Sequence, residues 1–328
     1  MSEELVRVEH LKKYFKVSSG LLKAVDDVSF SVARGETLGL VGESGCGKST
    51  VGRSILRLQE PTEGGVYFRG ENILLRPRSQ MKEMRGKLQI VFQDPYSSLD
   101  PRMNVLRLIE DSLRVNGVRD KKERLERVRA VMDVVGLEQR LLYSYPHELD
   151  GGRRQRIGIA RALVLNPDFI VMDEPVSALD VCVQAQILNL LCDLQDKMGL
   201  TYLFISHNLS VVKHLSSRIA VMYLGKIVEI ADKKTLFASP KHPYTQALLS
   251  SIPLPKYGVQ RERIVLEGDV PSPINLPSGC RFQKRCPYAQ ERCTREEPEL
   301  VEMDGALVAC HYAQERCCLL YTSDAADE

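Results

Sequence analysis

The sequence contains no run of about 18 consecutive apolar residues, which is the length that a helix needs to span a bilayer. Its first ten residues, MSEELVRVEH, are acidic and lack a signal-peptide core, so we expect the chain to stay in the cytoplasm. A charge bias is also missing, because 45 lysines and arginines balance 43 acidic residues to a net charge of +2. Such a balance argues against a general nucleic-acid binder, and we expect no nucleic-acid partner.

Disulfide spacing, internal repeats and low-complexity segments are equally missing. Of the nine cysteines, Cys182 and Cys192 lie in predicted helix and Cys46 lies in a glycine loop, where no disulfide partners are evident. The 328 residues are long for one compact domain, which predicts a main domain and a smaller C-terminal one. The last eleven residues, 318–328, look like a translated sequencing adapter, or else a frayed tail without function, and are left out of the fold prediction.

Short apolar runs that alternate with helical segments indicate an α/β fold. Residues 5–8 and 24–32 show the alternation of antiparallel strands on either side of a polar turn. Buried strands are predicted at 37–41, 88–92, 169–172, 203–206 and 219–223. Helices predicted over 181–197 and 209–215 separate the later strands, which favours a largely parallel sheet. Helical periodicity behind an Asp120 cap predicts an inserted helical subdomain at about 97–165.

The segment that follows the strand at 37–41 reads GESGCGKS and fits the phosphate-loop pattern G-x-x-x-x-G-K-[ST]. In such a loop the glycines let backbone N–H groups point at phosphates, Lys48 supplies a positive charge, and Ser49 offers its hydroxyl to Mg²⁺. The residues expected to hold the nucleotide are Gly42, Ser44, Gly45, Cys46, Gly47, Lys48, Ser49 and Thr50. The alternative is an incidental glycine-rich turn before a helix.

Two acidic residues, Asp173 and Glu174, directly follow the predicted strand at 169–172. Asp173 is expected to hold Mg²⁺ through water, and Glu174 is expected to polarise the attacking water. Acidic residues often follow strands merely as solvated caps. The pair therefore indicates catalysis only in combination with the phosphate loop.

Together these motifs resemble the ABC ATPase family over about the first 240 residues. The resemblance implies that Gln93 senses Mg²⁺ and contacts membrane subunits, and that His207 contacts the γ-phosphate. It also implies that the loop ending at Asp180 crosses a dimer interface. In the segment LKKYF, Phe15 rather than Tyr14 is expected to stack on adenine, although an aromatic residue there could equally belong to the core.

The family signature, usually LSGGQ, reads Leu149, Asp150, Gly151, Gly152 and Arg153 in this chain. In the family, its serine donates a hydrogen bond to the γ-phosphate on the other ATPase subunit, which an ionised Asp150 cannot do. A carboxylate about 4 Å from a phosphate charge costs on the order of 4 kcal/mol at an effective dielectric of about 20. We expect the site completed by this signature to be weak unless Arg153 compensates, so that the chain needs a partner with an intact signature. A sequencing error is the alternative.

The segments HPYTQALLSSIP and GDVPSPINLPSGCRFQKRCPY resemble the C-terminal extension of oligopeptide and dipeptide importer ATPases. The resemblance implies a P-loop NTPase of the ABC type over residues 1–240 and the extension over 241–317. It also implies an F-type subunit that uses ATP and Mg²⁺ at the cytoplasmic face of the membrane. Its partners would be a second, different ATPase subunit, two membrane permease subunits and, indirectly, an extracytoplasmic peptide-binding protein.

Four cysteines of the extension, Cys280, Cys286, Cys293 and Cys310, lie in a loop-rich segment with too few apolar residues for a core of its own. Four thiolates suit a [4Fe–4S] cluster or tetrahedral Zn²⁺. We prefer iron–sulfur, because family members with such cysteines resemble iron–sulfur proteins and the short C-x₂₋₄-C pairs of zinc ribbons are missing. Alternatively, the cysteines are reduced and act as small hydrophobic residues.

Two other functions stay open. A soluble ABC ATPase of DNA repair or translation usually carries two ATPase domains or a long coiled-coil insertion, and this sequence has neither. A regulatory ATP-binding subunit that hardly hydrolyses ATP fits the altered signature, whereas Glu174 and His207 argue against it.

Overall fold

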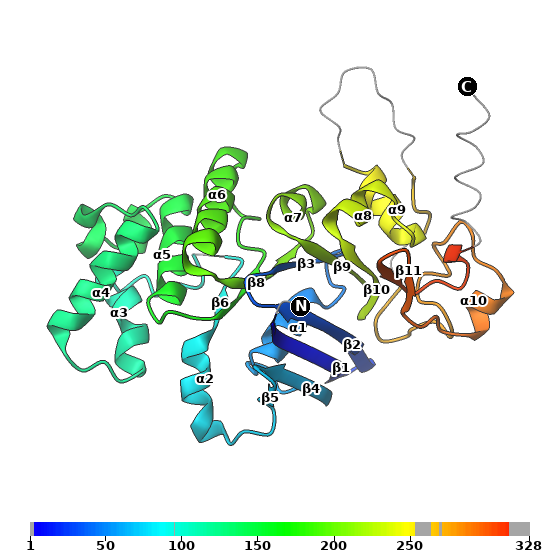
Figure 1. Ribbon diagram of the computed structural model, residues 1–328, viewed down its shortest axis with the longest axis horizontal. Helices are drawn as coiled ribbons and strands as arrows, with labels where there is room; N and C mark the ends of the chain where they lie inside the picture. The colour runs from blue at the N-terminus through cyan, green and yellow to red at the C-terminus, as the bar shows by residue number, and fades with distance from the viewer. Residues whose placement is uncertain (1–2, 95, 253–263, 269–270, 315–328) are drawn as a thin grey trace, which may run out of the picture.

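The structure, a computed structural model, describes residues 3–94, 96–252, 264–268 and 271–314. The adapter-like segment 318–328 lies outside these residues. A small antiparallel sheet lies below a larger mixed sheet, with helices at one end and along the upper side (Figure 1). None of the helices in the described ranges combines the length and apolar character needed to cross a membrane.

The antiparallel sheet has the strand order β2-β1-β4-β5. Its strands are β1 (Glu4–Val17), β2 (Gly20–Ala33), β4 (Glu63–Phe68) and β5 (Glu71–Asn72). The antiparallel pairing of the first two strands agrees with the prediction, but both run further than the alternation indicated. The extension of β1 to Val17 brings Phe15 into the sheet.

The larger sheet contains the parallel strands that carry the phosphate loop and the acidic pair. Its order is β11-β12-β10-β9-β3-β8-β7-β6. The parallel strands are β3 (Thr37–Val41), β6 (Leu88–Val91), β7 (Phe169–Asp173), β8 (Thr201–Ser206) and β9 (Arg218–Tyr223). Three of them, β3, β7 and β8, are buried along their full length, as expected for parallel strands covered on both faces.

Helices cover both faces of this sheet. On one face α1 (Lys48–Ile55) lies between the two sheets, and on the other face lie α6 (Val181–Met198) and α7 (Leu209–Leu215). The helical part at the left of Figure 1 contains α3 (Val105–Val115), α4 (Lys121–Val134) and α5 (Gly151–Leu163). Asp120 caps α4 as expected, since its carboxylate accepts hydrogen bonds from the backbone N–H groups of Lys122 and Glu123.

The remaining helices are short. They are α2 (Met81–Lys87), the 3₁₀ turns η1 (Arg78–Gln80), η2 (Gln139–Tyr143) and η3 (Pro146–Glu148), and α8 (Lys233–Ala238), α9 (Pro243–Ser250) and α10 (Glu291–Arg295).

The C-terminal region adds strands to the larger sheet. After β10 (Lys226–Asp232), the hairpin of β11 (Val301–Met303) and β12 (Ala306–Val308) returns, and β12 pairs antiparallel with β10. Apolar residues of this region, including Tyr244 and Phe282, belong to the same buried cluster as α6 and α7. The boundary at residue 240 stays a prediction, but the core runs continuously across it.

Candidate active site

The phosphate loop connects β3 to α1, and its backbone requires glycine. Gly47 has φ +107°, and a Cβ atom there would lie 2.0 Å from the carbonyl oxygen of Ala24. A Cβ atom on Gly42 would lie 2.1 Å from the carbonyl oxygen of Met222. The loop therefore packs closely against β2 and β9, as glycine permits and larger residues do not.

Lys48 opens α1, and its side chain folds back over the loop. The ammonium donates hydrogen bonds to the carbonyl oxygens of Gly42, over 2.8 Å, and Glu43, over 2.9 Å. The side chain is buried and carries a positive charge at the start of a helix, where backbone N–H groups lack intrahelical partners. This combination of groups favours an anion such as a phosphate.

Ser49 and Asp173 bring oxygen atoms together beside the loop. The Ser49 hydroxyl donates to Oδ1 of Asp173 over 2.6 Å, and the guanidinium of Arg53 lies 3.5 Å from Oδ2. Asp173 is the last residue of β7 and is buried. A hydroxyl and a carboxylate are hard oxygen ligands, so this pair fits Mg²⁺.

Glu174 lies between two polar side chains from neighbouring strands. The Gln93 amide donates to Oε2 of Glu174 over 3.2 Å, and Nδ1 of His207 lies 3.0 Å from the same oxygen. The Glu174 backbone has φ +49°, an unusual value for a residue other than glycine, and its N–H donates to Ile205 in β8. This conformation is the kind of backbone strain that concentrates at functional sites.

A cavity of about 470 Å³ has ten of the predicted site residues in its lining. Its lining residues are Phe15, Leu22, Ala24, Ser44, Gly45, Gly47, Lys48, Ser49, Thr50, Gln93, Glu174 and His207. The predicted residues Gly42, Cys46 and Asp173 are not among the residues that line it. Phe15 lines the cavity, whereas the hydroxyl of Tyr14 donates a hydrogen bond to Asp26. The stacking of Phe15 on adenine stays a prediction.

The signature residues lie outside this cavity, at the start of α5. Asp150 caps the helix, because its carboxylate accepts a hydrogen bond from the Arg153 N–H over 2.8 Å. The Arg153 guanidinium lies 3.4 Å from Asp150 and 3.2 Å from Glu138. This capping role was not predicted from the sequence, although an Asp directly before a helix is its usual signal.

The other residues predicted to lie at the dimer interface are also found at or next to the start of a helix. Gly151 and Gly152 form the first turn of α5, behind the buried Leu149. Asp180 caps α6 by accepting a hydrogen bond from the Val183 N–H over 3.0 Å. Within this chain, therefore, neither the signature nor Asp180 lines the cavity that holds Lys48.

The four cysteines of the C-terminal region share one small cavity, but their geometry does not support a metal. Cys280, Cys286, Cys293 and Cys310 line it together with His311 and several aromatic side chains. Among the residues described, no group of three or more Cys, His, Asp or Glu side chains is arranged to hold a metal ion. Burial raises the pKa of Cys280 to about 12. The iron–sulfur and zinc predictions therefore gain no support from the structure.

Comparisons with known proteins agree with the motifs. Residues 25–177 match the family described as ABC transporter, and residues 228–293 match the family described as oligopeptide/dipeptide transporter, C-terminal region. The chain is 51% identical to the oligopeptide transport ATP-binding protein AppF of Bacillus subtilis, over 94% of this chain and 97% of that protein. It is 50% identical to the dipeptide transport ATP-binding protein DppF of Haemophilus influenzae, over 92% and 94%.

A solved structure of a dimeric ATP-binding cassette in a post-hydrolysis state, bound to ADP and Pi, superimposes with a TM-score of 0.64. That chain is 30% identical to this one, and the match covers 70% of this chain and 99% of the other.

Proposed function

Because the chain belongs to the ABC transporter ATP-binding family and carries the oligopeptide/dipeptide C-terminal region, we propose that it powers the import of oligopeptides or dipeptides. The ABC-type fold and the family that the motifs predicted are confirmed, and with them the ATPase activity. The observation that carries the proposal is the cavity shared by Lys48, Ser49, Glu174 and His207.

In the proposed reaction the loop holds the phosphates of ATP. When ATP binds, the Lys48 ammonium leaves the carbonyl oxygens of Gly42 and Glu43 and binds phosphate oxygens. It binds these more strongly because they carry negative charge. Mg²⁺, when held by Ser49 and Asp173, would neutralise part of the phosphate charge. The backbone N–H groups of the loop hold the phosphates in line for attack.

Glu174 is the proposed general base. Its Oε2 accepts hydrogen bonds from the cavity side chains around it, which hold the carboxylate in one orientation toward the attacking water. Gln93 approaches this oxygen from the end of β6 and His207 from the end of β8. The proton from the water passes to Glu174, and His207 contacts the γ-phosphate.

A partner ATPase subunit completes the proposed site. The signature, which includes Asp150, lies outside the Lys48 cavity, and this position supports action on a nucleotide held by another subunit. Membership of a transporter family implies membrane permease partners. We propose that the second ATPase is a different chain with an intact signature. The assembly would contain two permease subunits at the cytoplasmic face of the membrane and receive peptides from an extracytoplasmic binding protein.

The metal at the four cysteines stays a prediction from their spacing. The four side chains line one cavity, but no group of three or more among the described residues is arranged to hold a metal ion. Iron, sulfide and zinc contents of anaerobically purified protein test it, and the absence of all three would leave the cysteines as small buried hydrophobic residues.

The test of the function is a peptide-stimulated ATPase assay on the chain co-purified with its permease subunits and second ATPase in liposomes. We expect Lys48→Ala to remove Mg-ATP binding and stimulated turnover, while Lys121→Ala, an exposed lysine at the start of α4, has no effect. A purified chain that fails to bind Mg-ATP, with no response to Lys48→Ala, would overturn the proposal. Turnover that no peptide stimulates would favour a non-transport ATPase.

A further inference from the structure

The C-terminal segment 280–286 contacts the phosphate loop at Glu43 and strand β2 at Asp26. We propose that Arg281 and Arg285 of this segment are positioning residues for the nucleotide: Arg285 holds the phosphate loop through Glu43, and Arg281 holds β2 through Asp26, whose carboxylate also binds Tyr14 beside Phe15. This inference rests on the proposed function of the cavity. It assigns to the C-terminal region a role in nucleotide binding that acts through the residues that these arginines hold.

At the phosphate end, Arg285 binds the carboxylate of Glu43, the second residue of the loop. Its Nη1 atom lies 2.8 Å from Oε2 and 3.1 Å from Oε1 of Glu43. The backbone N–H of Glu43 donates to the hydroxyl of Tyr244 in α9 over 2.9 Å. The carbonyl oxygen of Glu43 accepts a hydrogen bond from Lys48. Two side chains of the C-terminal region, Arg285 and Tyr244, thus bind Glu43, the residue whose carbonyl oxygen binds Lys48.

The ion pair of Arg285 with Glu43 also affects the electrostatics of phosphate binding. Glu43 places a carboxylate in a loop that must hold a highly negative ligand, and like charges a few ångströms apart repel. Arg285 is largely buried, so its interaction with Glu43 is weakly screened by solvent. The arginine therefore offsets a negative charge that would otherwise weaken phosphate binding.

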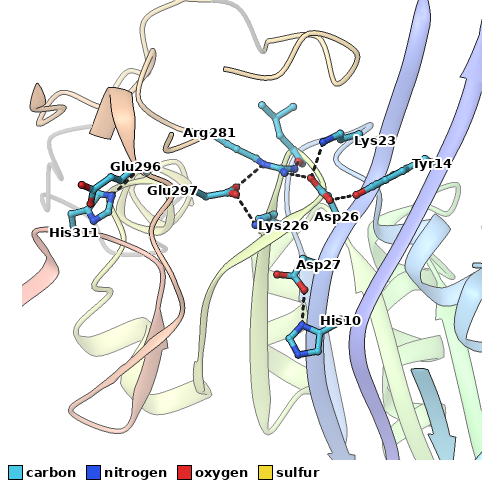
Figure 2. Close-up of polar contacts among 11 residues, drawn as sticks. His10, Tyr14, Lys23, Asp26, Asp27, Lys226, Arg281, Glu296, Glu297 and His311 are labelled. Atoms are coloured by element: carbon cyan, nitrogen blue, oxygen red, sulfur yellow. Dashed lines mark hydrogen bonds and ion pairs between the residues drawn. The ribbon is translucent and has the colours of Figure 1, made fainter. Parts of the chain in front are cut away.

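At the other end, Arg281 joins the C-terminal region to β2 (Figure 2). The buried guanidinium donates to Asp26, 255 residues away in the sequence, and to the carbonyl oxygen of Leu224. Asp26 in turn accepts a hydrogen bond from the hydroxyl of Tyr14. Tyr14 directly precedes Phe15 in β1, so the chain of contacts ends one residue from the aromatic side chain that lines the cavity.

The two ends are coupled through the turn after β9. The N–H of Gly225 donates to the carbonyl oxygen of Cys46 in the phosphate loop over 2.9 Å, and its own carbonyl oxygen accepts from the N–H of Asp26 over 2.9 Å. Arg281 binds the preceding residue of the same turn. Stability alone does not explain these buried ion pairs. Replacing such a pair by apolar side chains of similar volume often leaves the stability of a fold unchanged or raises it.

The test compares the affinities of the purified chain for Mg-ATP and for Mg-tripolyphosphate, which lacks the base. We expect Arg285→Ala to weaken binding of both probes by at least about tenfold, because the loop that it holds is shared by both. Arg281→Met, which keeps the side-chain volume, is expected to weaken Mg-ATP more than Mg-tripolyphosphate, because Arg281 contacts β2 directly and the phosphate loop through the turn after β9. Arg295→Ala is the matched control, since this exposed arginine of α10 pairs with Glu291 on the same helix. Arg285→Lys should recover most of the Mg-ATP affinity.

Affinities are measured on the folded fraction, so that a loss of stability is not mistaken for a loss of binding. Should Arg285→Ala fail to fold, Glu43→Gln removes the same ion pair from the loop side. In the Glu43→Gln background, Arg285→Gln should weaken Mg-ATP binding less than Arg285→Gln does in the wild type. Wild-type affinity in folded Arg285 and Arg281 variants, or effects of Glu43 and Arg285 that simply add, would overturn the inference. A wild-type chain without Mg-ATP affinity would instead overturn the proposed function.

Discussion

The carboxylate of Glu174 and the imidazole of His207 meet across the ends of two neighbouring strands, with Nδ1 lying 3.0 Å from Oε2. Glu174 follows β7 directly and His207 follows β8 directly. Because parallel strands end at the same edge of a sheet, two residues 33 positions apart in the sequence become neighbours. The contact depends on the register of β7 and β8, in which Asp173 pairs with Ile205.

Replacing the proposed base should separate binding from hydrolysis. We expect Glu174→Gln to lower kcat by about 10²- to 10⁴-fold, the usual contribution of a general base, while Mg-ATP affinity is retained. Phosphate release and nucleotide binding by the assembled complex check this. Glu302→Gln, at an exposed carboxylate on β11, is the control. Hydrolysis by Glu174→Gln at the wild-type rate would show that another group accepts the proton.

Two glycine substitutions should have opposite effects on stability. Gly47→Ala places a methyl group 2.0 Å from a backbone oxygen at φ +107°, so we expect a loss of about 1–3 kcal/mol or more in the free energy of unfolding and loss of nucleotide binding. Gly158 lies within α5, and a methyl group there would have no atom within 4 Å apart from those of its own helix backbone and chain neighbours. Gly158→Ala should therefore raise the free energy of unfolding by about 0.5–1 kcal/mol. Urea unfolding checks both values. Equal stabilities would contradict the tight packing of the loop against Ala24.

The altered signature can be restored without loss of the α5 cap. Serine caps helices about as well as aspartate, so we expect Asp150→Ser with Arg153→Gln to change stability by less than about 1 kcal/mol, whereas Asp150→Ala should cost about 1 kcal/mol. The double substitution should raise the ATPase rate of the complex with its partner ATPase, because the phosphate of the facing site regains a hydrogen-bond donor. A rate equal to that of the wild type would refute a weak signature site.

Acid should weaken the contact between Arg281 and Asp26. Burial alone raises the pKa of Asp26, but hydrogen bonds from Tyr14 and Arg281 outweigh it and lower the pKa below its usual value. A carboxylate with a lowered pKa stabilises the fold above its ordinary pKa of about 4 and loses this contribution as the pH falls through the lowered value.

The wild type should therefore exceed Asp26→Asn in free energy of unfolding by a constant amount above about pH 4, and the difference should shrink in stronger acid. Unfolding curves at several pH values measure it. Asp27→Asn, at the neighbouring carboxylate that pairs with His10 on the surface, is the control. A difference that stays constant into strong acid would show that Asp26 does not titrate with folding.

Sequence patterns predicted much of the fold because the caps and loops that they indicate depend on interactions between residues close together in the chain. The helix at Leu209–Leu215 has the predicted bounds, and Asp120 caps α4 as its position before an apolar repeat indicated. The phosphate loop lies between β3 and α1 as its motif requires. In each case the deciding interactions join residues close together in the chain, where sequence spacing corresponds to spatial distance.

Contacts between distant residues could not be predicted in the same way. The hairpin of β11 and β12 has only three residues in each strand, too few for a periodic pattern to indicate its pairing with β10. The contact of Arg281 with Asp26 depends on the path of the chain over more than two hundred residues. The arrangement of the four thiols depends on loop geometry, and spacing alone does not determine it.

Pairing of β12 with β10 also governs what would happen to a shortened protein. A chain that stopped at residue 240 would leave the outer side of β10 with a row of unsatisfied backbone N–H and C=O groups, which invites pairing with a second molecule. It would also expose apolar side chains that now pack against Tyr244 and Phe282. Such a fragment should self-associate and come out of solution, so the C-terminal region acts as a solubility element for the ATPase body.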